Sequence, residues 1–442
     1  METLFRGVVW FTFYVFLILV PLVAAAVFRQ AGGRTFLVGL GVACGYVGLS
    51  IMTIQFSLIS RVKSVSGAFG QDVLERFHRE MGYVAALFMI AHPVLLMLGG
   101  YPWALLNPFW EGNLPMWRWG TVALYGLALL IVLATFRKVL HVAYEWWQWS
   151  HAGLATLAVC CALMHVFIVG NYSASLAMRA LWSVYALNFF GLALWYRFIR
   201  PLRQWRRPWC VIDNIAERGN AHTLVLHPDG HPGFVFEPGQ FAWLTLGRTP
   251  FHFQQHPISI SSSAEVGRGG RIAFTIKALG DWSAKVVPRI QPGSSLWVDG
   301  PFGVFSPDRE QGPGFVLIAG GIGITPFRSM CETLADRQDV RPVILFYGGH
   351  DYDGLTFREQ FDVLASRMNL KIVYVLEKPC ASWQGERGFI TADLLRRHLP
   401  REYRRFQYFV CGPPALMDAM ERTLPEMGVP QEQVHTERFD LV

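Results

Sequence analysis

The sequence predicts a multidomain membrane protein: an all-α bundle of six transmembrane helices, then an antiparallel β-barrel, then a doubly wound α/β domain. Three observations lead to this fold class. Six long apolar segments occupy the first 200 residues, short strand-like runs follow from residue 210, and strands alternate with helices from residue 315. Of the 442 residues, 52% are hydrophobic and 16% charged, against roughly 25% charged in an ordinary soluble chain. This composition excludes a disordered protein and argues against a wholly soluble one.

The six apolar segments each have about the 20 residues that a bilayer-spanning helix needs. Arg197 lies near the end of the last segment, where its long side chain can reach the membrane interface. Twelve of the 16 tryptophans precede residue 211, as membrane interfaces favour. The predicted spans are residues 8–28, 36–59, 81–98, 119–136, 152–169 and 180–199.

The excess of basic residues is confined to the apolar half of the chain. Residues 1–210 contain 16 Lys and Arg against 6 Asp and Glu, whereas residues 211–442 contain 23 against 26. Positive charge beside hydrophobic segments sets membrane orientation, so it does not indicate nucleic-acid binding. Alternate loops are rich and poor in Lys and Arg, and the rich loops should be cytoplasmic. Both termini and residues 201–442 are therefore predicted to lie on the cytoplasmic side of the cell membrane.

Two pairs of histidines have the same spacing along two of the predicted helices. His78 and His92 bracket the third segment, 14 residues apart, and His151 and His165 bracket the fifth with the same separation. At about 100° per residue, this spacing falls about 40° short of four turns, so each pair shares one helix face over about 21 Å. Both helices run in the same direction, so one histidine from each can ligate each of two haems. His141 has no partner at this spacing and is expected at the membrane interface.

The seven cysteines include no C-x-x-C pair, and Cys160 and Cys161 are adjacent inside an apolar run. This pattern predicts no disulfide framework, zinc site or iron–sulfur cluster. Unpaired thiols in a reducing compartment are expected.

A basic linker, residues 201–209, separates the membrane domain, residues 1–200, from two further predicted domains. Residues 210–311 contain short runs typical of a small antiparallel barrel, and residues 312–442 alternate strands with helices as in a doubly wound sheet. The expected barrel strands are 210–215, 223–227, 241–246, 271–277 and 295–298. The expected α/β elements are strands 315–319, 342–347, 370–376 and 408–411 and helices 326–337, 357–368, 392–398 and 414–426.

Two motifs in the barrel region offer groups that suit a ring and a phosphate. The first joins residues 238–241 (PGQF) to 256–262 (HPISISS), where a serine-rich strand end supplies hydroxyls and backbone N–H groups. The second is residues 277–283 (KALGDWS), in which a strand is expected to end at Gly280 and a helix to begin near Asp281. A helix N-terminus there would suit a pyrophosphate. Taken alone, each motif fits an ordinary turn or a capped helix equally well.

Two motifs in the α/β region lie where nucleotides bind. Residues 319–326 (AGGIGITP) follow a buried strand and open a helix with proline in its first turn. Its glycines let a dinucleotide phosphate approach the backbone, although the pattern is not G-x-G-x-x-G. Residues 411–414 (CGPP) end a later strand, at the edge where an open parallel sheet binds ligands. The four motifs occur in this order on a barrel followed by a doubly wound sheet. Their joint occurrence favours cofactor binding over four unrelated turns.

These residues carry a family resemblance. The soluble half resembles the ferredoxin–NADP reductase-type flavoproteins. The whole chain resembles a short, prokaryotic-like form of the ferric reductase and NADPH oxidase superfamily, in which a six-helix haem-binding domain is fused to an FAD and NAD(P)H dehydrogenase domain. The resemblance covers nearly all 442 residues. Its most specific parts are the two histidine pairs and residues 256–259, 298–303 (VDGPFG), 320–326 and 411–413.

The resemblance implies a cofactor role for each motif. Ser259 would lie near the flavin ring, and Phe439 resembles the C-terminal aromatic residue that covers the flavin. The residues expected to contact FAD or its phosphates are His256, Pro257, Ile258, Ser259, Lys277, Gly280, Ser283 and Phe439. The residues expected to hold NADH or NADPH are Gly320, Gly321, Gly323, Thr325, Pro326, Cys411, Gly412 and Pro413. Cys411, Phe439 and Ser259 would be the catalytic residues, and His78, His92, His151 and His165 the ligands of haem iron.

Two departures from the family pattern bear on the substrates. Residues 348–351 (GGHD) follow the second α/β strand, where NADP-selective relatives often have Ser and Arg. An acidic residue there suits a free ribose better than a 2′-phosphate, which puts NADPH preference in doubt. Leu96 stands where the animal-type oxidases carry a further histidine, which weakens an oxygen-pocket assignment.

The expected enzyme is therefore an NAD(P)H oxidase or a ferric-chelate reductase. Electrons would pass from cytoplasmic NAD(P)H through FAD and two b-type haems to an acceptor outside. Oxygen, giving superoxide, and ferric iron are both open as that acceptor, and Arg179 at the outer start of the last span could hold a haem propionate or attract an anionic acceptor. No obligatory protein partner is evident, although a haem subunit that feeds a partner protein is a further alternative. A six-helix transporter or channel with a nucleotide-sensing domain is another, disfavoured because the spans contain almost no acidic residues.

Overall fold

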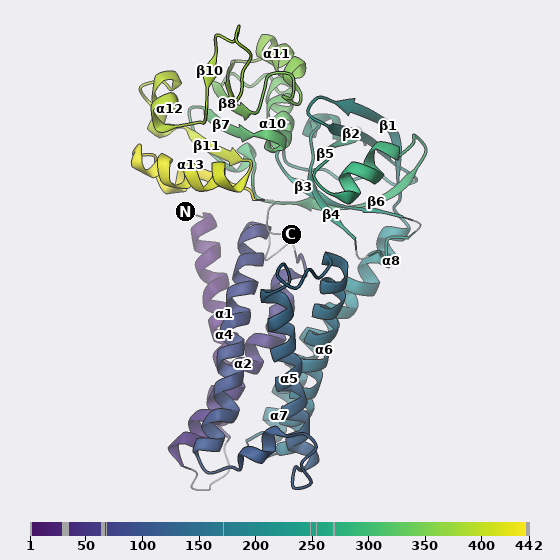
Figure 1. The fold of residues 1–442 in the computed structure, drawn as a ribbon, viewed down its shortest axis with the longest axis vertical. Helices are drawn as coiled ribbons and strands as arrows, with labels where there is room; N and C mark the ends of the chain where they lie inside the picture. The colour runs from purple at the N-terminus through teal and green to yellow at the C-terminus, as the bar shows by residue number, and fades with distance from the viewer. Residues whose placement is uncertain are drawn as a thin grey trace. The chain divides into compact units, whose positions relative to one another are not determined.

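The computed structural model describes residues 2–28, 35–62, 67, 69–170, 172–247, 249–252, 254–267 and 270–438. The chain divides into two compact units, Met1–Ile199 and Arg200–Val442. Figure 1 labels their helices and strands.

The first unit is a helical bundle. Within the described residues, six helices are long and apolar enough to cross a membrane, which confirms the predicted number of spans. The last of these runs on through a π-helical turn, Trp195–Ile199, into the short helix α8, Arg200–Trp205. The long helices are α1 (Glu2–Val27), α2 (Phe36–Ile59), α4 (Gln71–Leu98), α5 (Pro115–Thr135), α6 (Tyr144–Val169) and α7 (Leu176–Leu194).

Five of the six long helices begin earlier than hydropathy predicts, among them α1 at Glu2 and α7 at Leu176. α4 starts at Gln71 and not at residue 81, and α6 starts at Tyr144 and not at residue 152. α5 likewise starts at Pro115, four residues before the predicted position. The added turns carry polar or aromatic residues, which continue a helix without continuing an apolar run. The consequence is that His78 and His151 lie inside helices and not at their ends.

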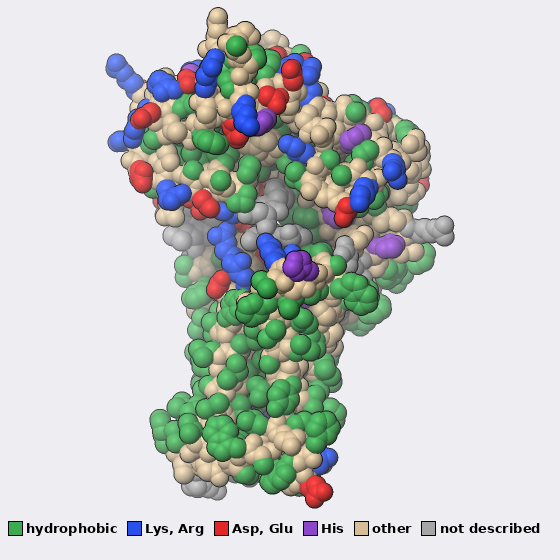
Figure 2. All heavy atoms as spheres, viewed as in Figure 1, with side chains coloured by type: hydrophobic (Ala, Val, Ile, Leu, Met, Phe, Trp, Pro, Cys, Tyr) green, Lys and Arg blue, Asp and Glu red, His purple; other side chains and the backbone are tan. Residues whose placement is uncertain are grey.

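The helical unit has an apolar surface as well as an apolar core. Large hydrophobic side chains such as Phe11, Leu87 and Leu129 are exposed on it. Figure 2 shows hydrophobic side chains over much of the visible face of the bundle. Its core is built around aromatic and small residues, with Trp182 fully buried and stacked on Tyr46. An exposed apolar surface of this extent is what a lipid-facing protein requires.

The second unit begins with an antiparallel sheet of six strands. The strand order is β4-β3-β6-β1-β2-β5, and a single bridge between Ile260 and Phe274 joins the two ends of the sheet. Its core contains the fully buried Leu224, Leu244 and Phe274. The strands are β1 (Trp209–Glu217), β2 (Ala221–Pro228), β3 (Phe241–Leu246), β4 (His256–Ser259), β5 (Ile272–Lys277) and β6 (Ser295–Phe302).

A parallel sheet of six strands follows, in the order β10-β9-β8-β7-β11-β12. All its pairings are parallel, as a doubly wound domain requires. The strands are β7 (Phe315–Gly320), β8 (Val343–Gly349), β9 (Leu370–Leu376), β10 (Glu386–Arg387), β11 (Gln407–Cys411) and β12 (Val434–Thr436). The helices are α10 (Thr325–Asp336), α11 (Arg358–Arg367), α12 (Ala392–His398) and α13 (Pro414–Glu426).

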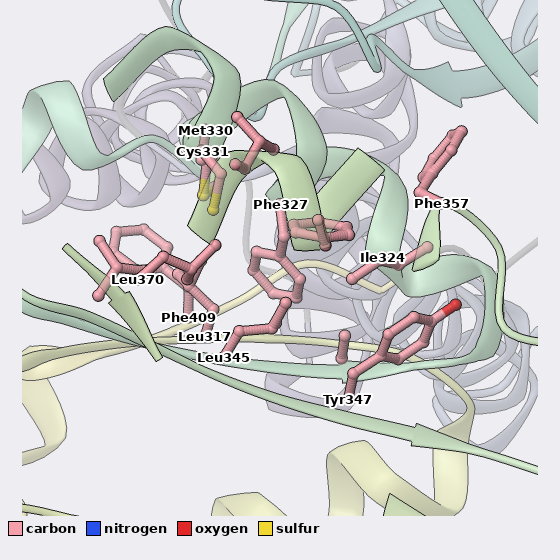
Figure 3. Close-up of a cluster of buried hydrophobic side chains, with 14 of the residues drawn as sticks. Leu317, Ile324, Phe327, Met330, Cys331, Leu345, Tyr347, Phe357, Leu370 and Phe409 are labelled. Atoms are coloured by element: carbon pink, nitrogen blue, oxygen red, sulfur yellow. The ribbon is translucent and has the colours of Figure 1, made fainter. Parts of the chain in front are cut away.

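Alternate residues of the central strand β7 face the two sides of this sheet. Leu317 packs with residues of α10 and α11 in one cluster, and Ile318 packs with residues of α12 and α13 in the other. Figure 3 shows the first cluster, where Phe327 and Met330 of α10 meet Leu317. Burial of a strand on both faces is the packing expected of a parallel sheet. The fold class predicted from the sequence is confirmed.

The edge strand β12 carries a half-buried histidine that makes stability dependent on pH. The ring of His435 stacks on Phe409 with centroids 4.8 Å apart, and its Nε2 lies 2.9 Å from Oε1 of Gln407. Burial lowers the pKa of His435 from 6.5 to about 4. Between these two values the unfolded chain binds the extra proton, so stability is full above pH 6.5 and falls as the pH falls toward 4. At about 1.4 kcal/mol per pH unit the loss approaches about 3 kcal/mol.

Thermal melts of the full chain between pH 7 and pH 4, followed by flavin release, measure this loss. The His435→Gln variant, which cannot take up the proton, should show a flatter profile over the same window. Parallel profiles for the two proteins would show that another group controls the pH dependence.

Candidate functional site

Four histidines of the first unit lie on two helices, α4 and α6, and form two pairs. We call His78 and His151 the first pair, and His92 and His165 the second pair. The ring centroids are 6.3 Å apart in both pairs, with interplanar angles of 61° and 70°. The 14-residue spacing therefore brings the same helix faces together at two levels of the bundle.

The separation of the rings suits a metal ion between them. Two imidazoles on opposite sides of one ion, with metal–nitrogen distances of about 2 Å and ring radii of about 1 Å, have centroids about 6 Å apart. Among the described residues, no group of three or more His, Cys, Asp or Glu side chains could hold a metal ion. Each pair thus offers two imidazole nitrogens, and a metal between them would need a further group to complete its ligands. A haem would supply that group, with its iron held by the two histidines of a pair.

Hydrogen bonds orient three of the four imidazoles. Nδ1 of His92 lies 2.8 Å from the carbonyl oxygen of Gly41, and Nδ1 of His165 lies 2.6 Å from that of Met116. Nδ1 of His78 lies 3.3 Å from the carbonyl oxygen of Gln55. A carbonyl only accepts, so Nδ1 carries the proton in each case and Nε2 is left for a metal.

A cavity of about 230 Å³ lies at the second pair. His92 and His165 form part of its wall, and most of the rest is apolar or aromatic, including Tyr46, Leu49 and Trp117, with Thr121 and Ser173 as further polar residues. None of the described residues that line it is charged. An apolar cavity with two imidazoles on its wall fits a haem macrocycle, whose faces are apolar.

Two other polar residues singled out from the membrane half, His141 and Arg179, belong to neither pair. His141 is in the turn between α5 and α6, with a left-handed φ of 51°. Arg179 is exposed in the first turn of α7. Leu96 lines the cavity close to His92.

In the second unit, the HPIS segment forms strand β4, which pairs with β3. Ser259 is opposite Phe241 and is buried, and Pro257 and Ile258 are half-buried. The ring of His256 stacks on Trp282, with centroids 3.7 Å apart. This contact brings the first barrel motif against the second one.

The serines that follow β4 are largely engaged within the protein. Ser261 Oγ lies 2.9 Å from Oγ1 of Thr275. The hydroxyl of Ser262 accepts from the amide of Ala273, and its carbonyl accepts from Ser329. Only the start of this segment therefore offers side chains to a ligand.

A helical segment begins near Asp281 as expected, but it is short and irregular. β5 ends at Lys277, and the chain then forms a five-residue π-helical turn, Trp282–Val286, followed by a 3₁₀ turn, Val287–Arg289. Pro288 lacks the amide hydrogen that a regular helix would need at that point. The hydroxyl of Ser283 accepts from the amide of Gly280 at 2.9 Å, so this motif is a tight loop closed on itself. Lys277 is half-buried and Gly280 exposed beside it.

The glycine-rich loop after β7 and the Cys-Gly-Pro loop after β11 are brought into direct contact. Gly320 and Gly412 are so close that a Cβ on Gly412 would lie 2.9 Å from the amide nitrogen of Gly320. A Cβ on Gly323 would lie 2.5 Å from the carbonyl carbon of Cys411. These glycines are required because the two backbones meet at the carboxyl ends of adjacent strands, where a parallel sheet binds ligands.

Other residues of these two loops shape the start of the helices. Gly321 has a left-handed φ of 54°, and residues Gly321–Ile324 form a 3₁₀ turn before α10. Thr325 Oγ1 donates to the carbonyl of Ile322, and Pro326 lies in the first turn of α10. Pro413 is exposed at the start of α13.

Cys411 is buried at the end of β11, and Glu437 lies near it. Burial, together with the Glu437 carboxylate, raises the pKa of the Cys411 thiol, so the sulfur stays protonated. Sequence reasoning missed Glu437, which is buried and follows the short strand β12. A signal was present, because Glu437 stands two residues before Phe439. Phe439 itself lies outside the residues that the structure describes.

Three family models match separate parts of the chain. Residues 44–162 match a ferric reductase like transmembrane component, residues 219–306 an FAD-binding domain, and residues 317–422 an oxidoreductase NAD-binding domain. The first match contains His78, His92 and His151 and ends before His165. The other two matches contain the four motifs of the second unit, and Phe439 lies beyond the last of them.

Similar proteins are reductases and flavohaemoproteins. The chain is 33% identical over 161 residues to NADH-cytochrome b5 reductase 2 of Scheffersomyces stipitis, which is 36% of this chain and 54% of the relative. It is 26% identical over 240 residues to a flavohemoprotein of Oceanobacillus iheyensis, covering 53% of this chain and 59% of the relative. The chain thus spans little more than half the length of these curated relatives. A solved flavohemoglobin from Malassezia yamatoensis aligns with 92% of this chain and 100% of its own, at 16% identity and a TM-score of 0.50, which is a likeness of fold alone.

Proposed function

We propose that this chain, whose architecture is that of the ferric reductases and NADPH oxidases, carries electrons across the cell membrane from NAD(P)H to an acceptor on the outer side. The observation that carries the proposal is the repeated histidine geometry. Two pairs with the same ring separation stand at two levels of one helical bundle, on a chain that also contains FAD-binding and NAD-binding domains. The finer assignment is an NAD(P)H oxidase or a ferric-chelate reductase.

The four histidines would hold two b-type haems through Nε2. Carbonyl oxygens of Gly41, Met116 and Gln55 fix three of the rings, which keeps Nε2 directed at its partner ring. When bound, FAD takes two electrons from a nicotinamide as hydride and releases them singly, and each haem accepts one. The chain's own contribution is ligation, a fixed spacing and an apolar surrounding.

The second unit would bind FAD in residues 210–311 and the nucleotide in residues 312–442. His256, Pro257, Ile258 and Ser259 would face the flavin, and the loop of Lys277, Gly280 and Ser283 would face its phosphates. Gly320, Gly321 and Gly323, with Thr325 and Pro326 starting α10, would let the nucleotide approach the backbone. Gly412 and Pro413 continue that surface. Cys411, with its thiol protonated, would lie beside the nicotinamide, with Ser259 and Phe439 at the flavin.

The proposed orientation follows from the basic loops. Arg61, Arg76, Arg79 and Arg137 lie at one end of the helical bundle by sequence, as does the linker after residue 200. Loops rich in Lys and Arg stay in the cytoplasm. Both termini and the second unit are therefore proposed to be cytoplasmic, with the first histidine pair on that side and the second pair toward the outside.

The nucleotide specificity is expected to favour NADH or to discriminate poorly. Asp351, just after β8, accepts a hydrogen bond from the amide of Gly354 at 2.7 Å, and Glu377 follows β9. These carboxylates would repel a 2′-phosphate placed at the ends of the two strands. The measurement is kcat/KM for both nucleotides. A preference for NADPH above about 100-fold, about 2.7 kcal/mol, would place a phosphate clamp elsewhere.

The proposal is tested on the full chain purified in detergent. We expect about two haems and one FAD per chain, and stopped-flow spectra in which NADH or NADPH reduces flavin and then haem. Oxygen and a ferric chelate, added separately, distinguish the two acceptor classes, and turnover by the chain alone excludes an obligatory partner. A preparation that binds flavin and nucleotide but no haem would overturn the proposal.

A further inference from the structure

The second histidine pair is clamped by two helices that use the same local arrangement. On α2, the carbonyl oxygen of Gly41 lies 2.8 Å from Nδ1 of His92, and one turn later the chain has Gly45. A Cβ on Gly45 would lie 2.8 Å from that same Nδ1 and 3.1 Å from the neighbouring Cε1 of the ring. The imidazole therefore occupies the space that a side chain at position 45 would fill.

α5 repeats the arrangement on the other ligand. The carbonyl oxygen of Met116 lies 2.6 Å from Nδ1 of His165, and one turn later the chain has Gly120. A Cβ on Gly120 would lie 3.0 Å from Nδ1 and 3.1 Å from Cε1 of His165. In both cases a carbonyl at one position accepts from the ring, and a glycine four residues later lets the ring reach it.

The first pair lacks this arrangement. The carbonyl of Gln55 is 3.3 Å from Nδ1 of His78, and the residue four positions later is the β-branched Ile59. Nδ1 of His151 is buried and has no hydrogen-bond partner among the described residues. The hydrogen bonds to the second pair, at 2.8 and 2.6 Å, are thus shorter than the 3.3 Å bond to His78. Both rings of the second pair are held by a carbonyl, whereas only one ring of the first pair is.

We propose that Gly45 and Gly120 are positioning residues that strengthen the Nδ1–H hydrogen bonds of the second pair and thereby give its haem the lower reduction potential of the two. The inference rests on the proposed function, in which the histidines ligate haem iron. A hydrogen bond from Nδ1 to a carbonyl raises the basicity of a ligating imidazole. A more basic ligand stabilises the ferric state over the ferrous state, which lowers the potential.

The test is a redox titration of the full chain, with haem content and low-spin ferric EPR spectra, for Gly45→Ala and Gly120→Ala. The added methyl group should push the ring away from its carbonyl and raise the potential of the lower component while the higher one stays in place. If the preference for the ferric over the ferrous state weakens tenfold, the one-electron reduction potential rises by about 59 mV. Loss of one haem of the two, with the higher component unchanged, would support the same role.

Two matched alanine variants control for the change of glycine itself. A Cβ added at Gly39 on α2 would have no atom within 4 Å. A Cβ added at Gly126 on α5 would lie 3.8 Å from its nearest neighbour, the Cβ of Ala158, which is an ordinary contact. Gly39→Ala and Gly126→Ala should keep both potentials and both EPR signals. The inference is wrong if Gly45→Ala and Gly120→Ala match these controls, or if they disturb both haems equally. A wild-type chain without haem would instead refute the proposed function, so the two failures are distinguishable.

Discussion

The His92→Ala variant is expected to lose one of two haems and all electron transfer to the outer acceptor. His92 is one of the two ligands proposed at the second pair, and its ring centroid lies 6.3 Å from that of His165. Loss of a group that hydrogen-bonds to a metal ligand typically lowers metal affinity by about 10–100-fold, so loss of a ligand itself should lower it more. Flavin reduction by NADH should continue at the wild-type rate, because the residues proposed to bind FAD and the nucleotide lie in the other unit.

The measurements are haem per chain, the rate of flavin reduction and the rate of acceptor reduction. His141→Ala is the matched control, since this histidine lies in the turn after α5, outside both pairs. It should keep both haems and full activity. If His92→Ala also keeps them, the second pair is not a haem site.

The Gly323→Ala variant is expected to lose nucleotide-dependent flavin reduction. Its Cβ would overlap the carbonyl group of Cys411, and backbone cannot give way as a flexible side chain can. The loop after β7 and the loop after β11 would have to separate, at a cost of about 1–3 kcal/mol or more. Because both loops carry the proposed nucleotide contacts, the KM for NADH should rise strongly, whereas the two haems should remain bound.

Gly321→Ala provides the comparison within the same loop. Gly321 has no atom within 4 Å of a built Cβ but has a left-handed φ of 54°. Alanine there should cost only the backbone strain, about 1–2 kcal/mol. Steady-state kinetics and a thermal melt of both variants distinguish two effects: displacement of the loops by the added Cβ, and backbone strain at the left-handed φ. Equal effects in the two would show that contact between the loops does not control nucleotide binding.

Much of the fold could be predicted because its determinants are local. Helix α12 begins at Ala392 as expected, since Thr391 caps it by accepting from the amide of Leu394. α13 begins at Pro414, a residue favoured in the first turn. The starts of α4 and α6 were missed because hydropathy marks where a span is apolar and not where its helix begins.

The candidate site was predictable where one helix carries the whole pattern, and not where several segments meet. The 14-residue spacing puts two histidines on one face of each helix. The same spacing on α4 and α6 brings their rings together in two pairs. The carbonyl partners on Gly41 and Met116 come from other helices, and a glycine one turn later is their only mark in the sequence. Glu437 was missed for the same reason, since it reaches Cys411 only through the three-residue strand β12.

The ends of the two sheets bear on how densely this protein can be packed in a membrane. An exposed sheet edge offers unpaired backbone groups on which a strand of a neighbouring molecule can add. Here the bridge between Ile260 and Phe274 joins the edges of the antiparallel sheet, and the edge strands of the parallel sheet, β10 and β12, have two and three residues. Edges this short leave little template for intermolecular strand addition. Copies held on one two-dimensional surface therefore have little free strand edge in the parallel sheet through which to associate.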